Sequence, residues 1–282
     1  MVDQDDKNDG YSDLDLSPSD SEQEAEDLPA EVGVTTEPQS IAFQLRLPAI
    51  DPEELTGELV VVEGPDGSGR STQIQLLTEW LEWNGYGVQT MGLRRSRLLA
   101  ENIDVLLGRN DVERTTLALL YATDFYDQLT NRIVPALRSG FIVLADRYVY
   151  TLIARAVVRG LDRDYLRDVY DFAVDPDLAF RLEVDPQVSF ERIFEEQQAI
   201  SYWEAGGDLN LSDNLYESFV IYQSRLREVF EKQAGHWGFE TIDGEQSVPT
   251  VNERLRGEIG EHLGISDISY EPSEEFLPVW NK

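Results

Sequence analysis

The segment EGPDGSGRST, residues 63–72, limits the possible folds of this chain more than any other feature of its sequence. It follows GELVVVE (57–63), an apolar run without alternation that predicts a strand buried on both faces. It leads into STQIQLLTEWLEWNG (71–85), where apolar residues recur at the spacing of a helix. A glycine-rich turn between a buried strand and a helix is the setting of a phosphate-binding loop, so we expect an α/β fold built around it.

The segment fits the pattern G-x4-G-[K/R]-[S/T], in which each residue type has a physical reason. Glycines let successive backbone N–H groups turn inward on an anion without Cβ clashes. The start of the following helix adds unpaired N–H groups and the positive end of the helix dipole. A hydroxyl at Ser71 or Thr72 suits Mg²⁺, and the cation at Arg70 reaches the β- and γ-phosphates of a nucleotide. The candidate nucleotide-binding residues are Gly64, Pro65, Asp66, Gly67, Ser68, Gly69, Arg70, Ser71 and Thr72.

Arginine at position 70 departs from the lysine that usually stands there. A guanidinium is planar, bulky and bidentate, whereas an ammonium is a compact point charge. Lysine is nearly absent from the chain, with three lysines against 20 arginines, so a drift from lysine to arginine fits the composition. The residue is equally compatible with normal phosphate binding, with slower chemistry and with a protein that only binds nucleotide.

Strand-like and helical segments alternate along the rest of the chain. This order predicts a P-loop NTPase three-layer sandwich, in which a mainly parallel sheet carries helices on both faces. Further strands are expected near 87–91, 141–145, 178–184 and 238–243. Helices are expected near 117–140, 150–160 and 163–174, from Pro186 onward, and near 215–235 and 248–263.

The composition excludes several classes of function. The chain carries 55 acidic residues against 23 Lys and Arg, a formal net charge of −32, which argues against binding along a nucleic-acid backbone. It has no cysteine and two histidines, so we expect no disulfide framework, thiolate metal site or histidine general base. No apolar run approaches the roughly 18 residues of a membrane span, and the N-terminus lacks a basic-then-apolar signal. We therefore expect a soluble, cytoplasmic protein without a membrane partner.

The acidic charge is spread over the chain rather than confined to one tail. Residues 1–40 hold 13 acidic residues and one base, while the rest of the chain holds 42 acidic residues against 22 bases. A high acid load with almost no lysine resembles the proteins of halophiles, in which molar salt screens self-repulsion. We predict an acidic disordered tail at 1–40, a P-loop kinase-like domain at 57–264 and a C-terminal extension at 265–282.

Three segments in order resemble the thymidylate kinase family and its close relatives, and they span about residues 57–243. These segments are EGPDGSGRSTQ, IVPALRSGFIVLADRYVYT and PDLAFRLEVDP. The resemblance implies a nucleoside monophosphate kinase that uses ATP and Mg²⁺. It also makes a homodimer an expectation.

The resemblance assigns roles to residues at the end of the strand FIVLA (141–145). Asp146 would hold Mg²⁺ with Ser71 or act on the acceptor phosphate, and Arg147 would bind that phosphate. Asp66 matches a carboxylate near the acceptor's sugar hydroxyl, and Tyr148 is counted with the substrate-binding residues. Because ligands lie at the carboxyl ends of strands in open α/β sheets, we expect Asp146 and Arg147 to face the phosphates.

Arg192 lies on the helix expected after LEVDP, where the family has a lid helix that carries arginines. A lid arginine would stabilise charge on the transferred phosphoryl group, but a solvated surface charge is an equally good interpretation. With this residue the candidate catalytic set is Arg70, Asp146, Arg147 and Arg192.

The acceptor-binding half matches the family less well than the phosphate loop does. TMGLRRSR (90–97) lacks the family's Arg-x-Pro-Gly-Gly-Thr loop, although Arg94 and Arg95 remain candidates for binding the acceptor phosphate. The family's Asp-Arg pair in the central helix is Asp124-Phe125 here, and its Tyr-Gln pair, which helps to read the thymine ring, is Arg155-Ala156. These departures support the class of enzyme more than the identity of its substrate.

Three functional hypotheses follow, and each needs a nucleotide as the partner. The leading one is ATP-dependent phosphoryl transfer to a nucleoside monophosphate, with dTMP, converted to dTDP, as the best guess. The second is a kinase for another nucleotide or small acceptor. The third is a nucleotide-binding P-loop protein without catalysis, which the arginine at position 70 and the altered acceptor motifs would favour.

Overall fold

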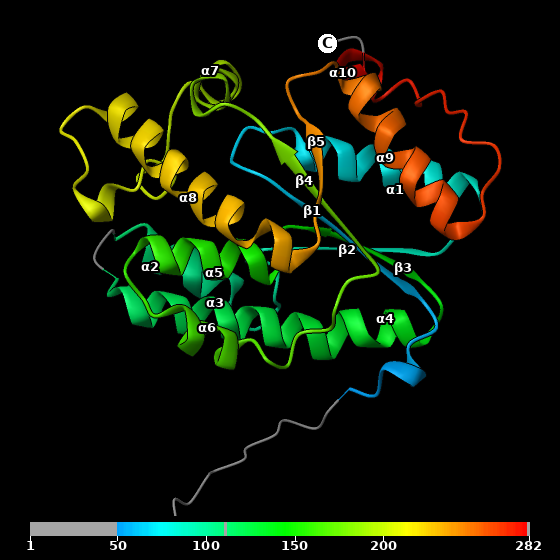
Figure 1. Ribbon diagram of the computed structural model, residues 1–282, viewed down its shortest axis with the longest axis horizontal. Helices are drawn as coiled ribbons and strands as arrows, with labels where there is room; N and C mark the ends of the chain where they lie inside the picture. The colour runs from blue at the N-terminus through cyan, green and yellow to red at the C-terminus, as the bar shows by residue number, and fades with distance from the viewer. Residues whose placement is uncertain (1–49, 110–111, 281–282) are drawn as a thin grey trace, which may run out of the picture. The chain divides into compact units, whose positions relative to one another are not determined.

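The computed structural model describes residues 50–109 and 112–280, so the tail predicted at 1–40 lies outside the described residues. Within them, five parallel strands form one sheet in the order β2-β3-β1-β4-β5 (Figure 1). The strands are β1 (Glu58–Glu63), β2 (Val88–Gly92), β3 (Ile142–Asp146), β4 (Leu178–Glu183) and β5 (Glu240–Asp243). The strand that enters the phosphate loop, β1, is therefore the central one. Its four inner residues, 59–62, are fully buried, which explains the apolar run without alternation.

Helices cover both faces of the sheet (Figure 1). They are α1 (Arg70–Trp83), α2 (Ala100–Leu107), α3 (Arg114–Gln128), α4 (Val134–Arg138), α5 (Val149–Val158), α6 (Arg163–Val169), α7 (Pro186–Gln197), α8 (Leu215–Trp237), α9 (Val248–Leu263) and α10 (Leu277–Trp280). On one face, α1 and α9 bury residues such as Leu77 and Leu255 against β1 and β4. On the other face, α3, α5 and α8 bury Phe125, Leu152 and Phe230. The predicted three-layer α/β sandwich is confirmed.

Two helical regions differ from the sequence-based expectation. The long helix expected near 117–140 is interrupted by a π-helical turn at Leu129–Ile133, directly before Pro135, which has no N–H to continue an α-helical ladder. Helix α2 was not expected, because only Ile103 and Leu107 of its eight residues are buried and the periodic signal is correspondingly short.

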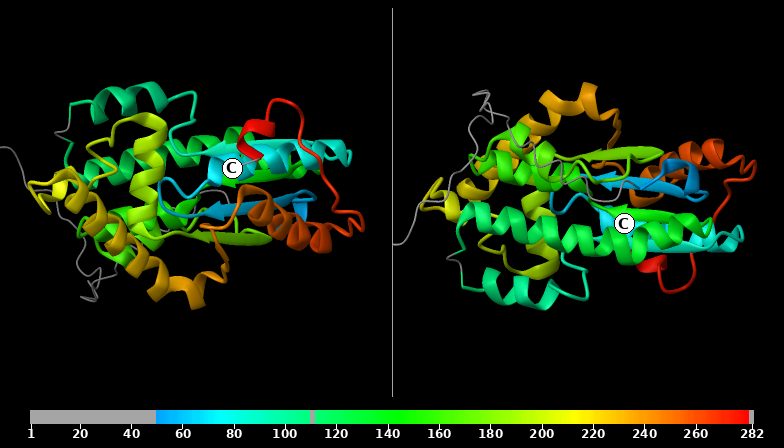
Figure 2. Two further views of the ribbon diagram at one scale, coloured as in Figure 1. Left: turned by 90° about the horizontal axis from the view of Figure 1, so that it is seen from above. Right: turned by 90° about the horizontal axis from the view of Figure 1, so that it is seen from below.

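The C-terminal extension packs against α1 and α9 (Figure 2). The hydroxyl of Tyr270 donates to Oε2 of Glu79 at 2.7 Å, and the backbone N–H of Ser273 donates to Oε1 of the same carboxylate at 3.0 Å. Ile265 and Ile268 join the apolar cluster of α1 and α9. The extension thus covers a helical layer of the domain. Among the described helices, none combines the length and the apolar character needed to cross a bilayer.

Candidate active site

The loop between β1 and α1 has the backbone shape that its glycines predict. Gly64, Gly67 and Gly69 have positive backbone φ values of 155°, 75° and 86°, which residues other than glycine seldom adopt. A Cβ on Gly67 would lie 2.7 Å from the carbonyl oxygen of Ser189 and 2.9 Å from the side chain of Ile193. The loop therefore needs glycine at this position both for its backbone angle and for its contact with α7.

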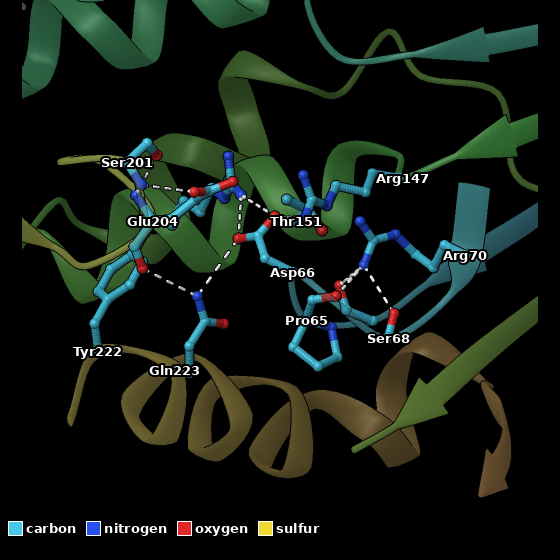
Figure 3. Close-up of polar contacts among 12 residues, drawn as sticks. Pro65, Asp66, Ser68, Arg70, Arg147, Thr151, Ser201, Glu204, Tyr222 and Gln223 are labelled. Carbon is cyan, nitrogen blue, oxygen red and sulfur yellow. Dashed lines mark hydrogen bonds and ion pairs between the residues drawn. The ribbon is translucent and has the colours of Figure 1, made fainter. Parts of the chain in front are cut away.

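Arg70, the first residue of α1, is 7% exposed and its guanidinium lies inside the loop (Figure 3). Its Nη1 donates to the carbonyl oxygens of Gly64 and Pro65 and, at 3.0 Å, to the hydroxyl of Ser68. Its Nε donates to Oδ1 of Asp146 at 3.0 Å. The guanidinium thus connects the phosphate loop with the end of β3. A lysine ammonium would not span both in this way, because the guanidinium donors point along fixed directions in one plane.

Asp146 ends β3 beside the start of α1. Its Oδ2 accepts a hydrogen bond from the Ser71 hydroxyl at 2.6 Å, while Oδ1 contacts Arg70. Burial raises the pKa of Asp146, but the charges of Arg70 and Arg147 outweigh it and the net pKa is lowered. A carboxylate and a hydroxyl side by side suit Mg²⁺, which uses one or two protein oxygens together with phosphates and water. The described residues contain no group of three or more His, Cys, Asp or Glu that would form a fuller metal cage.

Asp66 lies on the other side of the loop, between charged groups from α5 and its entry turn (Figure 3). It forms ion pairs with Arg147 Nη2 and, at 3.1 Å, with Arg155 Nη2. The amide of Gln223, on α8, donates to it at 3.4 Å. Burial raises the pKa of Asp66, but the positive charges of Arg147 and Arg155 reverse that effect and hold the pKa far below its usual range.

Glu63, the last residue of β1, fixes the turn that carries Asp146 and Arg147. It is fully buried, and its carboxylate accepts hydrogen bonds from the backbone N–H groups of Tyr148 and Thr151 and from the Thr151 hydroxyl. Burial raises the pKa of Glu63 despite these bonds. Glu63 was not among the predicted site residues, although a carboxylate at the end of an otherwise apolar strand is a visible signal.

Arg147 itself adopts a left-handed backbone conformation with φ of 72°, and its N–H donates to the carbonyl of Val62 at 3.0 Å. A non-glycine residue in this region is uncommon and is held by its surroundings. The turn aims the guanidinium across the carboxyl end of β1, where it meets Asp66 (Figure 3). Burial and the nearby charge of Arg70 lower the pKa of Arg147.

Not all predicted site residues lie in this cluster. Tyr148 is 1% exposed, packs edge-on against Phe125 with ring centroids 5.0 Å apart, and donates its hydroxyl to the carbonyl of Val174 at 2.8 Å. Its aromatic ring therefore belongs to the core, not to a substrate surface, and the expectation of substrate contact for Tyr148 is corrected. Arg192 of α7 donates to the carbonyl of Gly244, after β5, at 2.8 Å.

The two arginines that follow β2 diverge. Arg94 points to the surface and pairs with Asp104 at 2.7 Å, with 45% of its side chain exposed, so its guanidinium does not join the acceptor side. Arg95 borders a cleft together with Ser71 and Asp146. The loop is shaped by Asp124 of α3, which accepts hydrogen bonds from the backbone N–H groups of Arg94 and Ser96.

Two cavities flank Arg155, on the side of the cluster where the resemblance placed the acceptor. One lies between the loop and α8 and is bordered by Asp66, Arg147 and Gln223. The other lies between α3 and α5 and is bordered by Tyr121, Tyr170 and Trp203. Arg155 borders both. A glycine-rich loop that encloses an arginine, next to a second group of arginines beside two cavities, has the charge and the space that suit phosphate groups and a second ligand.

The fold and this loop define a P-loop nucleotide-binding protein of the α/β class. The family model of thymidylate kinase matches residues 62–254. The chain is 38% identical to a probable thymidylate kinase 2 of Saccharolobus solfataricus over 213 residues, which are 75% of this chain and all of that protein. It is 32% identical to a thymidylate kinase of Shouchella clausii over 216 residues, 73% of this chain and 96% of that protein. The chain belongs to the thymidylate kinase family, as the resemblance of its motifs implied.

Proposed function

We propose that this protein transfers the γ-phosphoryl group of ATP to a nucleoside monophosphate, with dTMP as the acceptor and dTDP as the product. The observation that carries the proposal is one continuous polar cluster at the carboxyl ends of β1 and β3. In it the buried contact of Arg70 with Asp146 lies next to the ion pair of Asp66 with Arg147. The names of the related proteins support thymidine nucleotides as substrates.

On the donor side, the loop N–H groups and Arg70 would bind the phosphates of ATP. The residues from Gly64 to Thr72, except Pro65, supply the backbone N–H groups, and Arg70 supplies positive charge that the loop carbonyls already hold in place. Since the transition state of phosphoryl transfer spreads charge over oxygens, preorganised charge at this point lowers the barrier.

Ser71 and Asp146 would hold Mg²⁺, since their oxygens are adjacent and of the type that this ion prefers. When bound, the ion neutralises charge on the phosphates and fixes their orientation. The lowered pKa of Asp146 keeps its carboxylate ionised for this role at neutral pH.

On the acceptor side, Arg147 would bind the phosphate of dTMP and Asp66 would accept a hydrogen bond from its sugar. An ionised carboxylate only accepts hydrogen bonds, so Asp66 repels a phosphate but suits a hydroxyl. Arg95 borders the cleft of Ser71 and Asp146 and would add positive charge there. Arg192, anchored on the carbonyl of Gly244, would approach the donor nucleotide from α7.

A panel of nucleoside monophosphates, each incubated with ATP and Mg²⁺ in molar KCl, tests this proposal. High salt is included because the net charge of −32 indicates a protein adapted to it. We expect dTDP and ADP in equal amounts and the highest kcat/KM for dTMP. Turnover of another acceptor with none of dTMP would refute the substrate assignment, and ATP binding without turnover of any acceptor would refute catalysis.

The remaining expectations extend this proposal. We propose a cytoplasmic homodimer that does not bind nucleic acid, with its catalytic domain at 57–264. Light scattering coupled to size-exclusion chromatography tests the assembly, and a monomer would contradict the homodimer. A duplex-DNA titration at low salt tests nucleic-acid binding, and an affinity for DNA that falls steeply with salt would contradict its expected absence.

A further inference from the structure

The carboxylate of Asp66 is held by more positive charge than one ion pair requires. Both Arg147 and Arg155 contact it, and the side chains of the three residues are 12–20% exposed. In such a setting a carboxylate that loses its partner becomes strongly destabilising, because water cannot solvate it. The second arginine therefore becomes important if the first one has to leave.

Arg147 is the arginine with a second task. It follows Asp146 directly and reaches Asp66 through Nη2, while its buried Nε has no hydrogen-bond partner among the described residues. If it binds the acceptor phosphate, as proposed above, its guanidinium must turn from Asp66 toward that phosphate. One guanidinium cannot keep its full contact with both anions, since its donors have a fixed geometry.

Arg155 is placed to take over. It lies on α5, two turns beyond Arg147, and its Nη2 donates to Oδ2 of Asp66 at 3.1 Å. Its Nη1 and Nε have no hydrogen bond to another described residue, and its side chain borders both acceptor-side cavities. The carbonyl of Arg155 accepts a hydrogen bond from Arg159, whose Nε and Nη2 are bound to Asp208, so the helix is anchored at this point.

We propose that Arg155 is a positioning residue that holds the Asp66 carboxylate in place while Arg147 moves to the acceptor phosphate. The inference rests on the proposed function. It assigns to Arg155 a task in binding any nucleoside monophosphate, at a position where the family pattern has a tyrosine. Without Arg155, the ion pair between Asp66 and Arg147 would compete with binding of the acceptor phosphate by Arg147, and the acceptor would bind weakly.

The test is a double-mutant cycle between Arg155 and Asp66, read out as the Kd of dTMP by calorimetry in molar KCl. Arg155→Gln is expected to weaken dTMP binding about tenfold, the size of one charge-assisted hydrogen bond, and to change the Kd of ATP less than about twofold. Arg155→Lys keeps the charge and should recover most of the loss. In an Asp66→Asn background, Arg155→Gln should weaken binding no further, because no carboxylate remains to compete for Arg147.

Arg114→Gln is the matched control. Arg114 borders one of the cavities beside Arg155, but among the described residues its guanidinium forms hydrogen bonds only with the backbone carbonyls of Arg159 and Asp208, both at 3.3 Å. Its effect should be the same in both Asp66 backgrounds. Thermal unfolding of each variant separates loss of fold from loss of binding.

Three results would overturn the inference: a tenfold loss from Arg155→Gln that persists in the Asp66→Asn background, an equal loss of affinity for ATP and dTMP, or no binding of any nucleoside monophosphate by the wild-type protein. Failure of the proposed function looks different, since the wild-type protein would then bind a nucleoside monophosphate but form no diphosphate, or would use an acceptor other than dTMP.

Discussion

The two arginine clusters of the site are built in opposite ways. On the donor side, Arg70 is held mostly by its own loop, through the carbonyls of Gly64 and Pro65 and the hydroxyl of Ser68. On the acceptor side, Asp66 meets Arg147 and Arg155, which lie 81 and 89 residues further along the chain. A charge held by neighbouring backbone stays where it is, whereas a charge held by distant side chains can be exchanged between partners.

This difference suggests a division of labour. Under the proposed function, the donor side would offer a fixed electrostatic environment, which suits the same triphosphate in every cycle. The acceptor side would hold its charges in ion pairs that an incoming phosphate can rearrange, which suits a substrate that must enter and a product that must leave. Substitutions on the two sides should therefore fail in different ways.

The largest effect is expected for Arg147→Ala. It should lower kcat with dTMP about 10³-fold, the scale on which arginines stabilise transferred phosphoryl groups, and leave the KM for ATP nearly unchanged. Steady-state kinetics in molar KCl measures both constants. Arg138→Ala is the control, because the side chain of Arg138 forms an exposed ion pair with Glu54 at the surface, and the variant should behave as the wild-type protein does. Full phosphoryl transfer by the Arg147 variant would mean that the acceptor side does not depend on this arginine.

Asp66→Asn should have the largest effect on stability. Breaking a buried ion pair from one side costs about 3 kcal/mol, because two arginines are then left without their carboxylate. The folded-state pKa of Asp66 lies below its ordinary value of 3.8, so its contribution to stability is present above pH 3.8 and declines as the pH falls through the folded pKa.

Urea unfolding at several pH values checks both parts of this prediction. The difference in unfolding free energy between the wild-type protein and the Asp66→Asn variant should be constant near neutrality and shrink below about pH 4. A difference that grows as the pH falls would contradict the direction of the pKa shift. Gln223→Leu is a useful companion variant, since it removes only neutral hydrogen bonds, one to Asp66 and one to the backbone carbonyl of Glu204, and should show no such pH dependence.

The same contrast explains how far sequence reasoning could go. The strand, loop and helix around 57–85 were predictable because their signals are local: an apolar run, glycines at fixed spacing and a helical period. The acceptor side was less predictable. The family pattern is absent at Arg155, and nothing local indicates that its guanidinium reaches Asp66.

Tyr148 and Glu63 also show that the local sequence does not indicate where a side chain points. Tyr148 stands inside a matching motif, yet its ring turns into the core, because the residues of one turn alternate between the site and the apolar layer below it. Glu63 stands in an apolar strand, yet it holds the first turn of α5 by hydrogen bonds to two backbone N–H groups. Which way a side chain points at the end of a strand depends on the tertiary structure around it.

Arg70→Lys should have a moderate effect that separates charge from shape. A lysine ammonium can replace the contacts of Nη1 with the loop but not the simultaneous contact of Nε with Asp146. We expect turnover within about tenfold of wild type and a loss of about 1 kcal/mol in the free energy of unfolding. Arg70→Ala, which removes the charge, should lose much more activity. If the lysine and alanine variants were equally inactive, the planar guanidinium itself would be required.

Arg94→Gln should have the smallest effect, although the sequence made Arg94 a candidate for binding the acceptor phosphate. Its pair with Asp104 is 45% and 58% exposed, and exposed pairs contribute about 0–1 kcal/mol, less still in molar salt. Its backbone N–H, which donates to Asp124, is kept by any substitution except proline. Kinetics and urea unfolding should both match wild type, within about twofold in KM for dTMP.

The neighbouring Arg95→Gln should raise the KM for dTMP more than Arg94→Gln does, because Arg95 borders the cleft of Ser71 and Asp146. The reverse order would mean that this loop rearranges on binding, so that the surface arginine, and not the cleft arginine, meets the acceptor phosphate.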